Sequence, residues 1–236
     1  MKTIAIIQAR MSSSRFPGKV LADLDGLPMV VFMASRVAQC AALDAVILAT
    51  SDEPSDDPLA EAAAANGLNV FRGPLQDVLG RFAMVQAKYQ ADVILRMTGD
   101  CPLADPRVIA QLIALRQEKS ADYASNVFPR SFPHGLDCEI FTADALRQAQ
   151  ANARDAYDRE HVTPWMHSDE AGFVIANLRQ SSDMSQMRLT VDHPEDLEVI
   201  RAVVTGAGRN ATLKDVTDWI AAHPDVAALN AAHKII

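Results

Sequence analysis

The amino-acid sequence predicts an α/β fold built around a mainly parallel β-sheet. Short apolar runs of strand length alternate with longer segments of helical character from the amino terminus to about residue 118. This alternation is typical of βαβ units, in which helices connect parallel strands. Prolines and a glycine mark helix boundaries, because Pro28 and Pro106 suit first helical turns and Gly67 suits a helix end.

The first predicted strand is Thr3–Gln8, an apolar run with three isoleucines that ends in a polar segment. It has the pattern of a buried strand that feeds a loop. The following elements are predicted from apolar runs, an alanine-rich stretch and an Asp-Pro helix start. The strands are 45–50, 69–72 and 92–97, and the helices are 28–40, 57–66, 76–90 and 105–118.

The pattern is less regular after residue 122. Prolines and aromatic residues over 122–134 indicate irregular structure. Beyond it the sequence predicts strands at 137–141, 172–178 and 187–191, and helices at 142–153, 156–167, 194–204 and from Thr212 onward. No linker or repeat divides the chain, so we expect one domain over residues 1–236, with an inserted acceptor or dimerisation subregion at about 122–190.

Composition excludes several classes of protein. The chain has 236 residues, 49% of them hydrophobic, and a net charge of −8, so a nucleic-acid polymer would be repelled on average. No stretch has the ~20 apolar residues of a membrane span, and the amino terminus lacks a secretory pattern, which favours the cytoplasm. The three cysteines are far apart, which favours buried free thiols over disulfides or a zinc site: Cys40, Cys101 and Cys138.

The loop after the first strand carries the strongest chemical signal. Arg10, Arg15 and Lys19 lie within ten residues of one another, interleaved with the serines of 12–14. Open α/β sheets bind ligands at the carboxyl ends of their strands, and Arg and Lys match phosphate oxygens. A solvated basic loop is the alternative. The segment is neither a P-loop, because Val20 follows Lys19, nor a dinucleotide-binding glycine motif.

Two aspartates follow predicted strands at the same expected edge of the sheet. Asp100 and Asp192 are candidates for a Mg²⁺ site opposite the basic loop, because paired carboxylates suit this cation. Helix capping is the alternative for Asp192, which precedes Pro194, and it is the expected role of Asp105.

Together these segments resemble the cytidylyltransferases that activate acidic sugars, of the acylneuraminate and 3-deoxy-manno-octulosonate type, and most closely the spore-coat polysaccharide biosynthesis branch. The resemblance runs from about residue 2 to 204. It rests on Ala9-Arg10 through Arg15-x-Pro17-Gly18-Lys19, Phe71-Arg72-Gly73 with Asp77-Val78-Leu79, Thr98-Gly99-Asp100-Cys101-Pro102-Leu103, Pro133-x-Gly135-x-Asp137-x-Glu139, Arg159-Glu160-His161-Val162-Thr163-Pro164, and Leu189-Thr190-Val191-Asp192.

The resemblance implies a GT-A-like nucleotidyltransferase fold, usually a homodimer, with Mg²⁺ as cofactor and CTP and an acidic sugar as ligands. It places catalysis at Arg10, Lys19, Asp100 and Asp192, with Mg²⁺ on the two aspartates. It assigns nucleotide binding to Ala9, Arg10, Ser13, Arg15, Lys19, Thr50, Asp52, Arg72, Asp77 and Thr98, and acceptor binding to Asn126, Asp137, Glu139 and His161. Gln8 and Gly80 depart from the pattern of many relatives.

The implied reaction is attack by the anomeric hydroxyl of a 2-keto sugar acid on the α-phosphate of CTP, with release of pyrophosphate. Other acceptors or nucleotides, and a non-catalytic nucleotide-binding protein, remain alternatives. A glycosyltransferase is disfavoured, because the single D-x-D motif, Asp23-Leu24-Asp25, lies in a predicted turn. Without the resemblance, a structural histidine is the preferred interpretation of His161. For Asp137 and Glu139, a solvated edge explains the pattern as well as a substrate-facing acidic patch does.

Overall fold

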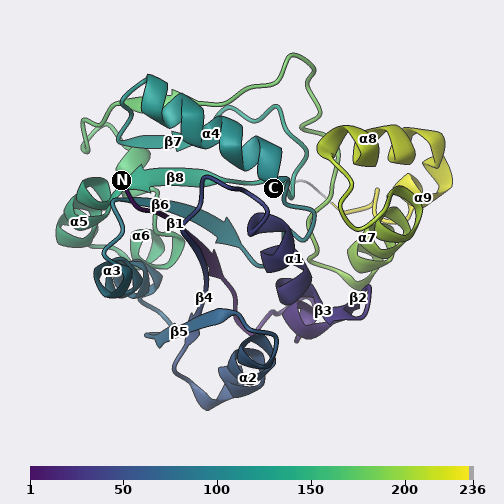
Figure 1. The fold of residues 1–236 in the computed structure, drawn as a ribbon, viewed down its shortest axis with the longest axis horizontal. Coiled ribbons are helices and arrows are strands. Elements are labelled where there is room, and N and C mark those ends of the chain that lie inside the picture. The colour runs from purple at the N-terminus through teal and green to yellow at the C-terminus, as the bar shows by residue number, and fades with distance from the viewer. Residues whose placement is uncertain (234–236) are drawn as a thin grey trace.

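The computed structural model describes residues 1–233 and has a seven-stranded mixed sheet at its centre, in the order β5-β4-β1-β6-β8-β7-β9 (Figure 1). Strands β5 (Asn69–Gly73), β4 (Ala45–Ser51), β1 (Thr3–Gln8) and β6 (Val93–Thr98) are mutually parallel. Strand β8 (Glu139–Thr142) is antiparallel to β6 and to β7 (Tyr123–Ser125), and β9 (Ile175–Asn177) is parallel to β7. The predicted α/β class is confirmed.

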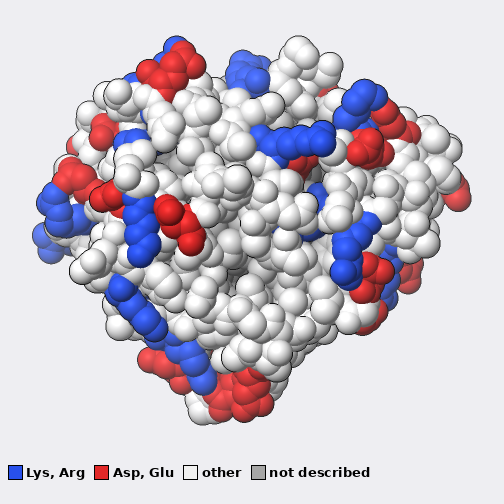
Figure 2. All heavy atoms as spheres, in the orientation of Figure 1, with Lys and Arg blue, Asp and Glu red and all other residues white. Residues whose placement is uncertain are grey.

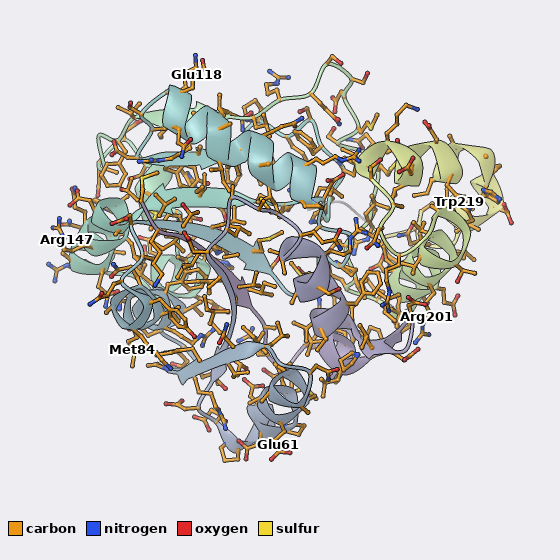
Figure 3. All side chains as sticks on the ribbon, in the orientation of Figure 1. Glu61, Met84, Glu118, Arg147, Arg201 and Trp219 are labelled. Atoms are coloured by element: carbon orange, nitrogen blue, oxygen red, sulfur yellow. The ribbon has the colours of Figure 1, made fainter. Side chains whose placement is uncertain are left out.

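Helices cover both faces of the sheet because alternate strand residues are apolar on each side. One buried cluster joins the sheet to α1 (Met29–Val37), α2 (Asp57–Ala65) and α4 (Pro106–Glu118). The opposite cluster joins it to α3 (Val78–Tyr89) and α5 (Ala143–Asn152). Charged side chains labelled in Figure 3 point outward from these helices, at Glu61, Glu118 and Arg147.

A third buried cluster holds the carboxyl-terminal helices together at one side of the molecule (Figure 1). It contains α7 (Pro194–Ala207) and α8 (Leu213–Ala222), which precede the short α9 (Pro224–Ala228). A small hairpin, β2 (Asp23–Leu24) and β3 (Leu27–Pro28), contributes Leu24 to this cluster. Trp219 of α8 lies against Gly206 of α7, where a Cβ atom would come within 2.3 Å of the indole.

The predicted strand at 187–191 is wrong. This segment forms only an isolated bridge between His134 and Arg188. Its backbone bonds are divided between two neighbours, since Leu189 pairs with His134 while the amide of Val191 donates to the Asp100 carbonyl at 2.8 Å. No continuous ladder results, and Asp192 therefore follows an irregular segment.

Two other predictions in the second half were wrong. The predicted helix 156–167 is divided into α6 (Ala156–His161) and a 3₁₀ turn at Trp165–His167, because Val162 has a φ of 73° and Pro164 cannot continue a helix. The region predicted as irregular contains strand β7, a run too short to show a strand period. No helix among residues 1–233 is long and apolar enough to cross a bilayer.

Candidate functional site

The site lies where β1 and β6 end side by side. The amide of Gly99 donates to the Gln8 carbonyl at 2.9 Å, and a Cβ on Gly99 would lie 2.8 Å from that of Ala9. The glycine therefore lets the two strand ends approach closely. As a result, the loop after β1 and the loop after β6 share one edge of the sheet, as their positions in the sequence predicted.

Internal backbone contacts and one buried carboxylate fix the basic loop after β1. The amide of Gly18 closes the loop on the Met11 carbonyl at 3.0 Å, and Gly18 adopts a φ of 74° that favours glycine. Asp56 accepts the Met11 amide at 2.7 Å and the Thr50 hydroxyl at 3.0 Å, and also bonds Ser51. Burial raises the pKa of Asp56, but these donors outweigh it and lower the pKa.

Lys19 brings the two predicted metal aspartates together. Its ammonium Nζ lies 2.9 Å from Asp192 Oδ1 and 3.5 Å from Asp100 Oδ2, and it donates to the Val191 carbonyl at 2.7 Å. Arg15 lies 3.0 Å from the same oxygen of Asp192. Two carboxylates thus converge on one cation position at the end of the basic loop.

A second layer of charge holds Asp192 in place. Arg188 Nη2 lies 3.1 Å from Asp192 Oδ2, and its Nε lies 2.8 Å from Asp196 Oδ1. Burial raises the pKa of Asp192. The opposite effect of the three cations, Lys19, Arg15 and Arg188, is larger, so the net pKa lies below its ordinary value. In the same way Arg188 and backbone amides overcome burial and hold the pKa of Asp196 at about 2. Both carboxylates are therefore charged at neutral pH.

The carboxylates fit a hard divalent cation such as Mg²⁺. Asp100 is the more open of the two, with 27% of its side chain exposed, and its Oδ1 accepts the Thr98 hydroxyl at 2.6 Å. Oxygen ligands of this kind are the ones that Mg²⁺ prefers. The ammonium group of Lys19 lies between the two aspartates, in the position where their negative charges attract a cation.

A cavity of about 370 Å³ opens beside this cation position. Of the predicted nucleotide-binding residues, Ala9, Arg10, Ser13, Arg15, Lys19 and Thr98 line it, together with Asp100 and Asp192. Arg10 is half exposed and lies 3.4 Å from Glu160 of α6 on the opposite wall.

Arg81 also lines this cavity, and the sequence reasoning missed it. Its side chain is buried and donates to the Pro74 carbonyl at 2.6 Å, but its Nε has no hydrogen-bond partner among the described residues. Burial lowers the pKa of this guanidinium, although Asp56 opposes the effect. The signal was an arginine on the apolar face of the helix, spaced with Val78 and Val85.

A second cavity, of about 360 Å³, adjoins the first, and Thr98 and His161 line both. Asp137 and Glu139 also line it. Glu139 is buried, and its carboxylate accepts the hydroxyls of Tyr123 at 2.6 Å and Thr163 at 2.7 Å and pairs with Arg96. Its bonds thus hold the wall of the cavity together.

Asp137 makes a two-pronged ion pair with Arg130 at the same wall. Asn126 lies outside both cavities. It is buried, and its amide bonds the Leu136 carbonyl at 2.8 Å and the Cys138 amide at 2.9 Å. The predicted acceptor set is therefore divided between wall residues and one buried structural residue.

Four predicted nucleotide-binding residues lie away from the first cavity. Thr50 is buried against Asp56, and the amide of Asp52 donates to the Gly73 carbonyl at 2.9 Å. Arg72 bonds the carbonyls of Ser51 and Glu53, each at 2.9 Å. These contacts fix the β4–β5 edge.

The fourth residue, Asp77, caps α3 and binds Arg159 of α6. A Cβ at Gly80 would lie 2.2 Å from the Asp77 carboxylate, which explains the glycine there.

The fold and the site define a class: an α/β protein with a basic cavity and two carboxylates on one cation position. The sequence model of the cytidylyltransferase family matches residues 4–217, and the chain belongs to this family.

Relatives extend this similarity over the whole chain. The spore coat polysaccharide biosynthesis protein SpsF of Bacillus subtilis (strain 168) is 32% identical over 231 residues, covering 94% of this chain and 95% of SpsF. The solved structure of a cytidylyltransferase from Leptospira borgpetersenii serovar Hardjo-bovis has a TM-score of 0.93 at 30% identity and covers 100% of this chain and 99% of that one.

A more distant structure shares the fold. CMP:2-keto-3-deoxy-manno-octonic acid synthetase complexed with CTP has a TM-score of 0.68 at 21% identity, covering 87% of this chain and 99% of that chain.

The prediction of buried free thiols is confirmed, because all three cysteines are free and buried.

Proposed function

We propose that this protein transfers CMP from CTP to the anomeric hydroxyl of a 2-keto sugar acid and releases pyrophosphate. The observation that carries the proposal is Lys19, whose ammonium lies between Asp100 and Asp192 in the lining of the basic cavity. Similarity to a spore coat polysaccharide protein and to a synthetase of a 2-keto acid supports an acidic sugar as acceptor.

The basic loop binds the triphosphate in this reaction. The anomeric oxygen forms a bond to the α-phosphorus, the bond between the α-phosphorus and the bridging oxygen breaks, and the hydroxyl proton passes to solvent. Arg10, Arg15 and Lys19 neutralise charge on the departing pyrophosphate, and Arg81 adds a buried donor to the cavity wall. The chain contributes mainly position and charge.

Asp100 and Asp192 would hold Mg²⁺, which when bound supplies additional positive charge to the phosphates. Thr98 orients Asp100 through its hydroxyl, and Arg188 orients Asp192. Because the ammonium of Lys19 now lies between the two carboxylates, it would have to leave this position for Mg²⁺ to bind there, which would turn it toward the phosphates.

The acceptor occupies the second cavity, where His161 and Thr98 separate it from the nucleotide. Arg96 and His167 of that cavity carry donors that suit a sugar carboxylate. Glu139, Asp137 and the buried Asn126 keep the walls in place, and His161 reaches the reacting atoms from the boundary of the two cavities.

We place the reaction in the cytoplasm and expect a homodimer. Strand β9 is an edge strand, and about half of its first residue Ile175 and of the preceding Val174 is exposed, which suits an interface. Sedimentation at micromolar concentration measures the state, and a monomer would contradict it.

The proposal predicts that Asp100→Ala and Lys19→Ala lower kcat/KM at least ~100-fold, because Lys19→Ala removes a positive charge beside the phosphates and Asp100→Ala removes a ligand of the proposed Mg²⁺. Pyrophosphate release with CTP and a 2-keto sugar acid measures this. Asp218→Ala, on the exposed face of α8, is the matched control and keeps wild-type turnover. Folded Asp100 and Lys19 variants with near-normal turnover would refute the assignment.

A further inference from the structure

Two histidines and a glutamate meet at the start of α7, apart from the cavities described above. His193 precedes the helix, Glu195 lies in its first turn, and His233 comes from the far end of the described chain. One candidate ligand atom from each lies within 4.8 Å of the others. The two imidazole rings stack with centroids 3.9 Å apart and planes 6° apart, and His233 Nε2 lies 3.3 Å from Glu195 Oε2.

The segment that carries His233 is fixed by a second, buried contact. Asn230 donates to Asp196 Oδ1 at 3.0 Å and to the Arg188 carbonyl at 3.3 Å. A cavity of about 730 Å³ runs beside it and is lined by Asn230 and His233. The packing of the chain therefore holds the backbone of His233 over α7, while the ring stack sets only the present orientation of its side chain.

We propose that His193, Glu195 and His233 form a binding site for Zn²⁺ or a similar borderline transition metal. Two imidazole nitrogens and one carboxylate oxygen suit Zn²⁺, whereas Mg²⁺ prefers a shell of oxygens alone. Ligand bonds of about 2.0–2.1 Å place tetrahedral ligand atoms ~3.3 Å apart, so modest side-chain rotations close the cluster on an ion.

The two imidazole rings must turn out of their stack to bind the ion. The side chains of His233 and Glu195 are partly exposed, which leaves room for this rotation. A fourth position faces solvent and takes water. The ion would join the carboxyl-terminal segment to the residue directly after Asp192, so that it fastens one side of the candidate catalytic site.

Equilibrium titration with Zn²⁺, in excess Mg²⁺ and against a chromophoric chelator, tests the site in the full-length protein. The wild type binds one equivalent. His233→Ala and Glu195→Gln each weaken binding about tenfold or more, because each removes one of three ligands. Glu198→Gln, one turn further along α7, and His223→Ala, which removes a histidine stacked on Trp219, are the matched controls and keep wild-type affinity.

Two further measurements distinguish binding at the histidines from binding at the candidate Mg²⁺ carboxylates. Asp100→Ala keeps the Zn²⁺ equivalent if the histidines bind it, and loses it if the ion goes to the carboxylates. Zn²⁺ raises the thermal midpoint of the wild type but leaves that of His233→Ala unchanged. A wild type that binds no Zn²⁺, a His233→Ala protein with unchanged affinity, or loss of binding in Asp100→Ala overturns the proposal.

Discussion

At the scale of single residues, the charges that surround the first cavity divide into those used within the fold and those left for a ligand. Asp192 is paired with three cationic side chains, and Asp56 is saturated by donors. The Nε atom of Arg81 is buried without a partner among the described residues. A buried donor of this kind costs free energy unless a ligand satisfies it.

Arg81→Met is therefore expected to raise the KM for CTP about ten- to a hundredfold, the usual range for one hydrogen bond to a charged group. The thermal midpoint should change little, because methionine fills the apolar helix face without a desolvation cost and this gain offsets the lost bond to the Pro74 carbonyl. Steady-state kinetics and thermal unfolding measure the two effects. Arg147→Met on the exposed face of α5 is the control, and an unchanged KM in Arg81→Met would contradict the assignment.

Sequence reasoning identified the residues that stand out from their surroundings. Arg10, Arg15 and Lys19 are concentrated cations in an acidic chain, and Asp100 follows a clear strand, so all four were predicted for the site and line its cavity. Asp56 and Arg81 were not found, because one aspartate among several in an acidic stretch and a single arginine in a helix are both common in sequences. Their roles depend on the burial and partners that folding creates.

At the scale of elements, α6 links the two cavities and is held by α3. Asp77 at the start of α3 accepts the Gly80 amide at 2.9 Å and binds Arg159 of α6 at 2.6 Å. Burial raises the pKa of Asp77, but Arg159 and the Gly80 amide lower it by more than burial raises it. The net pKa is below its ordinary value, so the carboxylate stays charged. The position of α6 thus depends on a carboxylate that fits only because residue 80 has no side chain.

Gly80→Ala is expected to destabilise the protein by about 1–2 kcal/mol, because the new methyl group displaces a carboxylate that three donors hold. In an Asp77→Ala background the same change should stabilise it by ~0.5–1 kcal/mol, the ordinary preference of a helix for alanine over glycine. Urea unfolding of the four proteins in this cycle gives the sign. Equal effects of Gly80→Ala in both backgrounds would show that the contact is unimportant.

The elements of the first half were predictable and several of the second half were not, for a physical reason. Strands β1, β4 and β6 are mostly buried parallel strands with largely apolar runs, which local sequence reports well, and the shorter edge strand β5 follows a helix end at Gly67. Strand β7 has three residues, and its pairing with β8 and β9 depends on distant segments. The segment 187–191 has a strand-like composition, but its hydrogen bonds go to two different partners.

At the scale of the whole molecule, charge is dispersed outside the site. Figure 2 shows Lys and Arg interspersed with Asp and Glu around one face, with no broad area of a single sign. The net charge of −8 repels large polyanions from the molecule as a whole, whereas the concentrated basic loop attracts a small anion over a short distance.

One buried carboxylate couples the stability of the whole sheet to pH. Glu139 joins β8 to β6, to β7 and to the segment after α6. Burial raises the pKa of Glu139, but Arg96 and the hydroxyls of Tyr123 and Thr163 lower it more, so the net pKa is below its ordinary value. The native state therefore takes up this proton at a lower pH than the unfolded state does.

This stabilisation is complete above the ordinary glutamate pKa of about 4.3 and is lost as the pH falls below it toward the native pKa. The free energy of unfolding should thus fall more steeply for the wild type than for Glu139→Gln as the pH drops from about 5 through the ordinary glutamate pKa of about 4.3 and below it. Urea unfolding across this range measures the slopes. Parallel pH profiles for the two proteins would rule out this role of Glu139.

The measurement that decides the proposed activity is pyrophosphate release in the presence of Mg²⁺. Each of the four nucleoside triphosphates is tested against sialic, legionaminic, pseudaminic and octulosonic acids, and the phosphorus-containing product is identified by NMR. We predict that CTP is the single nucleotide of the four that supports pyrophosphate release, and that it does so with at least one of these acids. The product should carry CMP on the sugar. Release with another nucleotide, turnover only with a sugar phosphate, or CTP binding without any release would contradict the proposed function.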